Sequence, residues 1–309
     1  MALRKRPGDD RMWALATALI DGRAIPCLRV DERLYPFPAL SPALPAATID
    51  LFADWPASAA SLQSLAATVA AGKGPAPLDA ATPLLAPLLY PGKVLCAGAN
   101  YYDHMAEMGF PGVKKETQRL FFFTKPPRNA VVGPGATVVM PRGTKKYDWE
   151  IELAAVIGKT ARYVTPERAL EHIAGYTVAI DMSARDFNMA PDQFYKFDWV
   201  AGKATDTGCP LGPWIVPASA FPDPQNIALK LSVNGETKQD SNTNQMIFSI
   251  AEQIARASEI MTLDPGDVIL TGTPAGVGVP KGTFLNVGDR IDAEIAGIGA
   301  LSVTIAREA

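Results

Sequence analysis

The stretch DWEIELAAVIG, residues 148–158, alternates acidic and apolar side chains over its first six positions. Side chains two apart on a β-strand point to the same side, so this pattern predicts a strand with Glu150 and Glu152 on one face, roughly 6.5–7 Å apart along the backbone. Two carboxylates this close repel each other, and a divalent cation relieves the repulsion. The stretch therefore predicts a metal site, with a solvent-facing strand of alternating charge as the alternative.

A third acidic residue, Asp181, directly follows a second predicted strand, residues 177–180. Three carboxylates without sulfur or imidazole suit Mg²⁺, Mn²⁺ or Ca²⁺ and leave positions for water or substrate. The chain contains only two histidines, His104 and His172, which excludes a three-histidine zinc site. Any metal in this protein would therefore rely on acidic side chains.

The overall composition excludes several classes of function. The 309 residues carry 29 Lys and Arg against 32 Asp and Glu, a net charge of -3, so no basic surface for nucleic acid is expected. The three cysteines, Cys27, Cys96 and Cys209, are too far apart for a disulfide framework or a zinc cluster. Because no secretion signal or membrane-length apolar run is present, we expect no membrane partner and a reducing, cytoplasmic location.

The beginning of the chain differs from the remainder. Residues 13–30 predict a hairpin around an Asp-Gly turn, and residues 58–71 predict a helix. Residues 72–93 contain five prolines and predict a connector. We therefore expect a small N-terminal α/β domain with its connector, residues 1–88, and a larger domain, residues 89–309.

Short strands dominate the predicted larger domain, and helices are few. A helix is expected over residues 246–261, and another from Thr165 to Gly175, with His172 near its C-terminus where a partly positive imidazole is favoured. The fold class is α+β and sheet-rich. The predicted strands are residues 94–97, 120–124, 137–140, 148–157, 177–180, 227–233, 236–239 and 268–271, with more within 290–305.

His104 is the candidate general base. It follows the strand 94–97, and Glu107 comes three residues later, on the same face if the segment is helical. A carboxylate that orients an imidazole makes a competent base near neutral pH, and the alternative is a surface His–Glu pair. Lys203, between glycine and alanine, would stabilise negative charge beside a metal, unless it is simply solvated.

The glycine-rich turn TGTPAGVG, residues 271–278, does not predict a nucleotide site. It lacks the Gly-Lys-Ser/Thr ending of a phosphate loop and opens no helix. A cradle of backbone N–H groups for a carboxylate is the remaining interpretation.

Six motifs occur in an order that resembles the fumarylacetoacetate hydrolase (FAH) family. They are G-x-N-Y-x-x-H-x-x-E at 98–107, F-x-K-P at 123–126, D-x-E-x-E-L-x-x-V-I-G at 148–158, D-x-S-A-R-D at 181–186, K-x-x-D-x-x-x-P-x-G-P at 203–213 and G-D-V-I-L-T-G-T-P-A-G-V-G at 266–278. The resemblance covers about residues 90 to 305, and the preceding part looks like a variable extension. It implies an FAH-type mixed β-roll catalytic domain and a homodimer.

The resemblance also implies roles for individual residues. Glu150, Glu152 and Asp181 match the metal ligands, which would hold Mg²⁺ or Mn²⁺. His104, assisted by Glu107, would activate water, and Lys203 would stabilise the developing enolate or oxyanion. The expected substrate-binding residues are Arg185, Thr273, Tyr101, Gly272 and Asn188.

One position near this site departs from the family pattern. Asn188 stands where the family commonly has glutamine, and either Asn188 itself, one methylene shorter, or Gln193 would supply the amide. Residues 104–116 match a lid over bound substrate. Aromatic residues at Phe187 and between residues 194 and 197 suggest either an apolar, ring-derived acyl group, as in aromatic compound catabolism, or simply core packing.

The function expected from these features is divalent-metal-dependent hydrolysis of a carbon–carbon bond in a small 2-oxo or 1,3-dioxo acid, such as an acylpyruvate or fumarylacetoacetate. An isomerase or tautomerase, or a decarboxylase acting on an oxaloacetate-like acid, would use the same site. A non-catalytic protein that binds a small acid is the alternative of another class.

Overall fold

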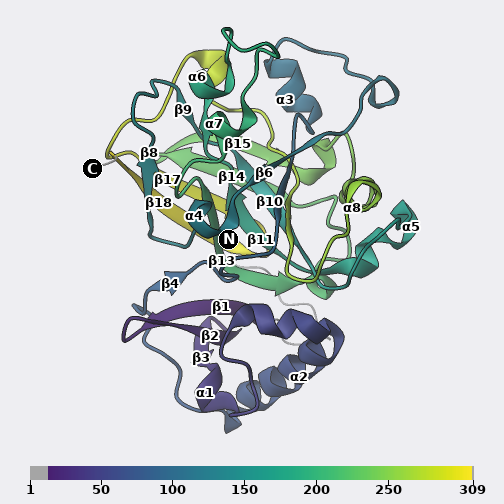
Figure 1. The fold of residues 1–309 in the computed structure, drawn as a ribbon. Helices are drawn as coiled ribbons and strands as arrows, with labels where there is room; N and C mark the ends of the chain where they lie inside the picture. Colours follow the sequence, from purple (N-terminus) through teal and green to yellow (C-terminus); the bar gives the residue numbers. More distant parts are fainter. Residues whose placement is uncertain (1–12, 308–309) are drawn as a thin grey trace.

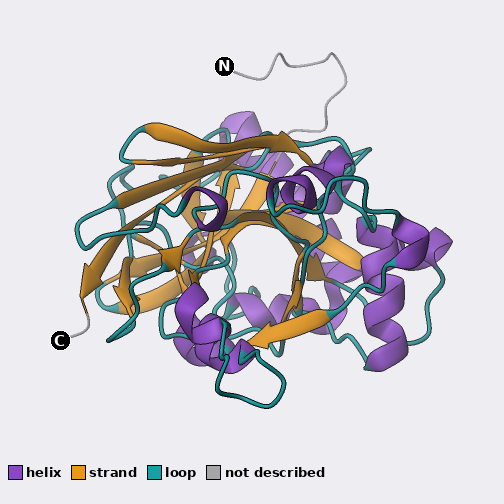
Figure 2. Ribbon diagram, turned by 90° about the horizontal axis from the view of Figure 1, so that it is seen from above, coloured by secondary structure: helices purple, strands orange, loops and turns teal. Residues whose placement is uncertain are grey.

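The computed structural model describes residues 13–307 and confirms the sheet-rich α+β class (Figure 1). Two large sheets and one short β-pair form the structure, in the orders β3-β2-β1-β13-β11-β10-β16-β5-β6, β15-β14-β17-β18-β8 and β12-β9, with β4 beside β1 and β7 beside β13. Seen from above, the strands curve around the centre of the molecule, and most helices lie toward the outside (Figure 2).

The strands are mostly short, as expected. They are β1 Trp13–Ile20, β2 Arg23–Val30, β3 Arg33–Pro36, β4 Leu84–Leu85, β5 Val94–Ala97, β6 Phe122–Lys125, β7 Val131–Val132, β8 Thr137–Met140, β9 Tyr147–Asp148, β10 Ile151–Ile157, β11 Ile173–Ile180, β12 Ser183–Ala184, β13 Cys209–Pro217, β14 Ala228–Val233, β15 Glu236–Asn242, β16 Val268–Leu270, β17 Arg290–Ile295 and β18 Gly299–Arg307.

Within residues 13–307, only two of the α-helices are longer than two turns. The α-helices are α1 Phe37–Leu40, α2 Trp55–Thr68, α3 Tyr102–Glu107, α4 Pro127–Ala130, α5 Pro166–Ala169, α6 Arg185–Asn188, α7 Trp199–Lys203 and α8 Ile250–Ile260. A π-helical turn, Val69–Lys73, extends α2, and single 3₁₀ segments are Thr48–Asp54, Lys115–Thr117, Leu170–His172, Ala218–Ala220, Thr243–Gln245 and Val279–Lys281. In Figure 1, α3, α6 and α7 lie at the same end of the molecule.

The predicted N-terminal hairpin is present as β1 and β2. Its turn residues Asp21 and Gly22 both have left-handed backbone angles, φ 49° and 73°, as a tight hairpin turn requires. β1 also pairs with β13 at Leu15 and Ile215, so the hairpin extends the large sheet. The boundary at residue 88 stays a prediction.

The alternation in residues 148–158 does not create a solvent-facing strand. Every residue of β10 is buried, because β10 pairs with β11 and β16 and its faces pack into two apolar cores. One of these cores includes β14, β17 and β18 of the second sheet. The solvent-facing alternative is therefore wrong, and both glutamates are buried.

Three predicted helices have other boundaries in the structure. The helix predicted over residues 58–71 is α2, which begins at Trp55 and continues through the π-helical turn to Lys73. α8 begins at Ile250 rather than at residue 246, because Ser249 and Glu252 form a capping box. The helix after Thr165 does not continue to Gly175, which lies in β11 instead. A Cβ on Gly175 would approach the Val216 carbonyl oxygen to 2.3 Å, so this glycine permits close pairing with β13.

Candidate metal centre and acid–base dyad

Three carboxylates meet at one end of the β10–β11 pair. Glu150 directly precedes β10, Glu152 lies in it, and Asp181 directly follows β11. The antiparallel register pairs Ile151 with Ile180, which brings these strand ends together. One oxygen from each carboxylate lies within 4.8 Å of the others, and all three residues are buried.

The electrostatics of the cluster fit a bound cation. Burial, followed by the negative charges of Asp181 and Glu150, raises the pKa of Glu152 well above its usual value. Burial would also raise the pKa of Glu150, but the charges of Arg185 and Lys203, with a smaller contribution from His104, hold that pKa below its usual range. An oxygen-only set with excess negative charge suits a hard divalent ion such as Mg²⁺ or Mn²⁺.

Lys203 and Arg185 are ion-paired to the carboxylate cluster. Lys203 Nζ donates to Glu150 Oε2 at 2.8 Å and Asp181 Oδ2 at 2.6 Å. Arg185 Nη2 lies 2.5 Å from Glu150 Oε1, and its Nε donates to Asp148 Oδ2 at 2.9 Å. Both expected cations therefore border the centre, where they reduce the repulsion between its acids, and their contacts with substrate stay predictions.

Lys125 is a buried cation that the sequence analysis did not select. Its Nζ lies 2.7 Å from Asp181 Oδ1 and donates to the carbonyl oxygens of Met182, Lys203 and Gly208. Burial would lower the pKa of Lys125, but the charge of Asp181 raises it. The sequence feature that could have identified Lys125 is the F-x-K-P motif, in which this lysine follows three consecutive phenylalanines and one threonine.

We expect Lys125→Met to lower the free energy of unfolding by about 3–5 kcal/mol, because it leaves Asp181 Oδ1 and three carbonyl groups buried without their cationic partner, while Asp181 Oδ2 keeps Lys203. Chemical denaturation measures this change. Lys230→Met, at an exposed position of β14, is the control and should change stability by no more than about 0.5 kcal/mol. Equal stability of the Lys125 variant and the wild type would contradict the structural role.

The predicted His104–Glu107 pair is formed. Both residues lie on α3, and His104 Nδ1 is 2.8 Å from Glu107 Oε1. Their side chains are 12% and 17% exposed, which does not fit a freely solvated surface pair. A carboxylate can only accept a hydrogen bond, so in the neutral imidazole the proton is on Nδ1 and points to Glu107. The Nε2 lone pair is then available as a base.

The glycine-rich turn 271–278 binds carboxylates, but they belong to the protein itself. Gly272 N–H donates to Glu152 Oε2 at 2.6 Å, and Gly276 N–H donates to Glu107 Oε2 at 2.8 Å. Gly278 N–H donates to Asp148 Oδ1 at 2.7 Å. One turn therefore connects the metal cluster with the dyad.

The remaining predicted substrate-binding residues are buried. Thr273 Oγ1 donates to the Ile151 carbonyl at 2.9 Å, and Tyr101 is fully buried, with no hydrogen-bond partner for its hydroxyl among residues 13–307. Asn188 donates from Nδ2 to the Asp198 carbonyl at 3.3 Å, whereas Gln193 is exposed. Their contacts with substrate stay predictions.

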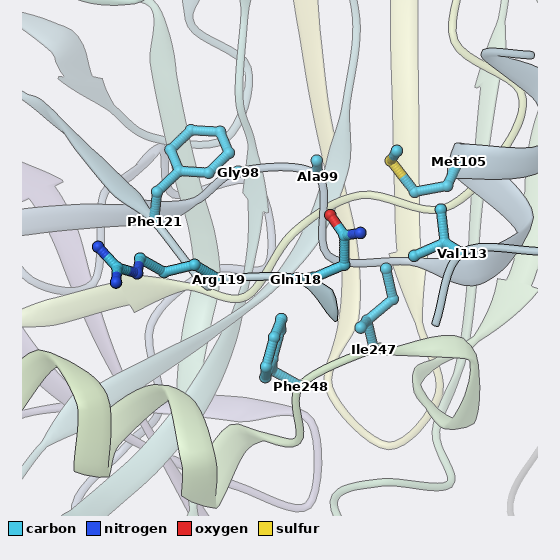
Figure 3. A pocket seen from close by; sticks show the side chains of 9 residues that line it. All are labelled: Gly98, Ala99, Met105, Val113, Gln118, Arg119, Phe121, Ile247 and Phe248. Carbon is cyan, nitrogen blue, oxygen red and sulfur yellow. The ribbon is translucent and has the colours of Figure 1, made fainter. Parts of the chain in front are cut away.

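A cavity of about 110 Å³ lies beside the dyad helix (Figure 3). It is bounded by the segment after β5, by Met105 of α3, by the expected lid and by the loop before α8, and none of the three metal-site acids lines it. The residues that line the cavity are Gly98, Ala99, Met105, Val113, Gln118, Arg119, Phe121, Ile247 and Phe248.

The side chains of Phe194 and Tyr195 are 87% and 83% exposed, so core packing does not explain these two aromatic residues.

The fold and the site together define a sheet-rich protein in which a cluster of three carboxylates, suited to a divalent metal, lies next to a histidine–glutamate dyad. Residues 93–306 match the family model described as fumarylacetoacetate (FAA) hydrolase C-terminal. The chain belongs to this family, as its motifs predicted. This chain is 45% identical over 219 residues to the mitochondrial oxaloacetate tautomerase FAHD2A of Bos taurus. The aligned region covers 70% of this chain and 67% of the relative.

Solved structures support the same assignment over nearly the whole chain. The fumarylacetoacetate hydrolase of Exiguobacterium antarcticum is 33% identical, with a TM-score of 0.79, and the match covers 96% of this chain and 100% of that one. The maleylpyruvate hydrolase of Sphingobium sp. SYK-6, in complex with manganese(II) and pyruvate, is 32% identical, with a TM-score of 0.75 and the same coverage. The predicted FAH fold is therefore confirmed.

Proposed function

We propose that this protein is a divalent-metal-dependent hydrolase that cleaves a carbon–carbon bond in a small acylpyruvate-type 2-oxo acid. The observation that carries the proposal is the oriented dyad beside the carboxylate cluster: Glu107 holds His104 Nδ1 at 2.8 Å and is itself held by Gly276 at 2.8 Å. A site that only binds a small acid has no need of an oriented base.

An ion held by Glu150, Glu152 and Asp181 would polarise the 2-oxo group of the substrate. His104 Nε2 takes a proton from water, and the resulting hydroxide adds to the distal carbonyl carbon. The bond between that carbon and its neighbour on the pyruvate side then breaks. The electron pair passes to the pyruvate portion, which takes up the proton that His104 received from water. The products are pyruvate and a carboxylic acid.

Product identification tests this proposal. Purified protein with Mg²⁺ or Mn²⁺ is expected to convert fumarylpyruvate or a simple acylpyruvate into pyruvate plus the corresponding acid, and chelation should stop the reaction. Pyruvate is measured with lactate dehydrogenase, and the acid by mass spectrometry. No pyruvate release across a panel of acylpyruvates would refute the hydrolase.

A tautomerase is the second candidate, favoured by the 45% identity to a relative named oxaloacetate tautomerase. In that reaction His104 would move a proton between carbon and oxygen without adding water. Enol–keto conversion of oxaloacetate, followed by ultraviolet absorbance, would support it if acylpyruvates remain uncleaved. Pyruvate release from oxaloacetate would instead indicate a decarboxylase.

The homodimer and the cytoplasmic location are also proposals. No helix within residues 13–307 has the length and apolar character to cross a membrane. The three cysteines are free and buried, which fits a reducing compartment. Since the FAHD2A relative is named a mitochondrial protein, fractionation is the test of location, and light scattering is the test of the dimer.

A further inference from the structure

An end strand of the five-stranded sheet contacts both halves of the candidate site. β15 pairs with β14 in that sheet and lies at its edge. Gln239 and Ser241 are two positions apart on β15, so their side chains project from the same side. Neither residue belongs to the metal cluster or to the dyad.

Gln239 connects the metal-binding strand with the glycine-rich turn. It is fully buried, and its Oε1 accepts the Ile151 N–H at 2.9 Å, between the two glutamates of the metal cluster. Its Nε2 donates to Thr273 Oγ1 at 2.8 Å and to the Pro274 carbonyl at 2.9 Å. A single amide therefore aligns the strand and the turn that together hold Glu152.

The backbone of β15 also supports the turn where it holds the dyad. Gly276 has φ +107°, and a Cβ there would approach the Lys238 carbonyl oxygen to 1.9 Å. This close approach requires glycine and places the Gly276 N–H against Glu107. The position of Glu107 is thus defined relative to β15.

Ser241 ties the dyad helix to the same strand. Its hydroxyl donates to Asp103 Oδ2 at 2.6 Å, and Asp103 Oδ1 accepts the His104 N–H at 2.8 Å. Helix α3 has only six residues, and its N-cap residue, Tyr101, makes no side-chain cap. A helix this short is not stable alone, so its position depends on such tertiary contacts.

We infer that Gln239 and Ser241 are positioning residues that set the placement of the His104–Glu107 dyad relative to the metal carboxylates. The inference rests on the proposed function for its catalytic consequence, but the geometry it describes does not depend on the substrate. Displacement of a catalytic base by about 1 Å can lower the rate of the catalysed reaction about 10²-fold, so this alignment affects turnover directly.

The Gln239 contribution is tested by metal binding. Gln239→Met is expected to weaken Mn²⁺ binding by at least about tenfold in calorimetric titration, because Ile151 and the turn lose their shared anchor. Gln239→Asn keeps the amide but is one methylene too short to reach both sides, so it should weaken binding in the same direction while remaining folded. Asp240→Asn, on the opposite side of β15, is the matched control and should bind Mn²⁺ like the wild type.

The Ser241 contribution is tested by the behaviour of α3. Ser241→Ala should lower kcat about 10- to 100-fold with KM within about twofold, and Mn²⁺ affinity should be unchanged. Amide hydrogen exchange in α3 should become faster, and Ser241→Thr, which keeps the hydroxyl, should restore both values. If the wild type cleaves no substrate, the proposed function fails, but exchange and metal binding still decide the positioning roles.

Two results would overturn the inference. Wild-type Mn²⁺ affinity in a folded Gln239→Asn protein would remove the role of Gln239. Wild-type exchange in α3 of Ser241→Ala would remove the role of Ser241.

Discussion

Glu152→Gln is expected to lower turnover by at least about 10³-fold, because it removes the charge of one of the three carboxylates that we propose to hold a divalent metal. The amide is almost isosteric with the carboxyl group and its oxygen still accepts the Gly272 N–H, so the fold around β10 should be retained. Steady-state rates at saturating Mg²⁺ or Mn²⁺, together with calorimetric metal titration, measure the change. Retained activity after exhaustive chelation of the wild type would refute the metal assignment.

The same variant should change thermal stability in opposite directions with and without metal. In the metal-free protein, folding raises the pKa of Glu152 well above 4.5, its value in the unfolded chain. As the pH rises above 4.5, the carboxyl group ionises in the unfolded chain more readily than in the folded protein, so the free energy of unfolding falls. At pH 8 in a chelator, Glu152→Gln should therefore melt at a higher temperature than the wild type. With Mg²⁺ the order should reverse, because the ion stabilises only the protein that binds it.

A matched variant separates charge from position in this experiment. Glu294→Gln removes an exposed carboxylate on β17 and should melt like the wild type in both conditions. Destabilisation of Glu152→Gln in the chelator at pH 8 would mean that the ion pairs of Lys203 and Lys125 already compensate the whole cluster.

His104→Ala is expected to lower kcat by about 10²- to 10⁴-fold while metal binding is nearly unchanged. The imidazole supplies the base, and it takes no part in the carboxylate cluster. Stopped-flow or coupled pyruvate assays measure the rate, and calorimetry measures the metal affinity. Loss of metal in this variant would identify His104 as a ligand and remove it as the base.

Two controls accompany the His104 variant. Glu107→Gln removes the charge and leaves one oxygen to accept from either His104 Nδ1 or the Gly276 N–H, but it keeps the imidazole, so it should lower kcat less than His104→Ala does. His172→Ala should leave kcat unchanged, because His172 is buried and bonds through Nδ1 to the Lys159 carbonyl at 3.1 Å. A rate loss in His172→Ala equal to that in His104→Ala would contradict the assignment of the base.

Local spacing was enough to predict the groups that lie on one element. Glu150 and Glu152 share a strand face because side chains repeat every two residues, and His104 and Glu107 meet because residues three apart are neighbours on a helix. The order of six motifs predicted the family. The hairpin at residues 21–22 followed from the backbone freedom of Asp-Gly.

Partners far apart in the chain could not be predicted in this way. Lys125 meets Asp181 across 56 positions, and Gln239 bonds to Ile151 across 88. No local periodicity encodes these contacts: the first forms within the large sheet and the second forms where the two sheets pack. The second sheet covers one face of β10, and a core with residues of β1, β2 and α2 covers the other, so the solvent-facing strand that the alternating charges had left open does not form.

The sequence by itself determined the chemistry that this protein can carry: three carboxylates, one dyad and no histidine-rich metal site. Only the tertiary structure decided how strongly those groups interact. Burial removes water from the carboxylates, so their repulsion and their ion pairs act at full strength, and the pKa of Glu152 rises while that of Glu150 falls. A strand pattern specifies which side chains share a face, but what lies against that face depends on the rest of the chain.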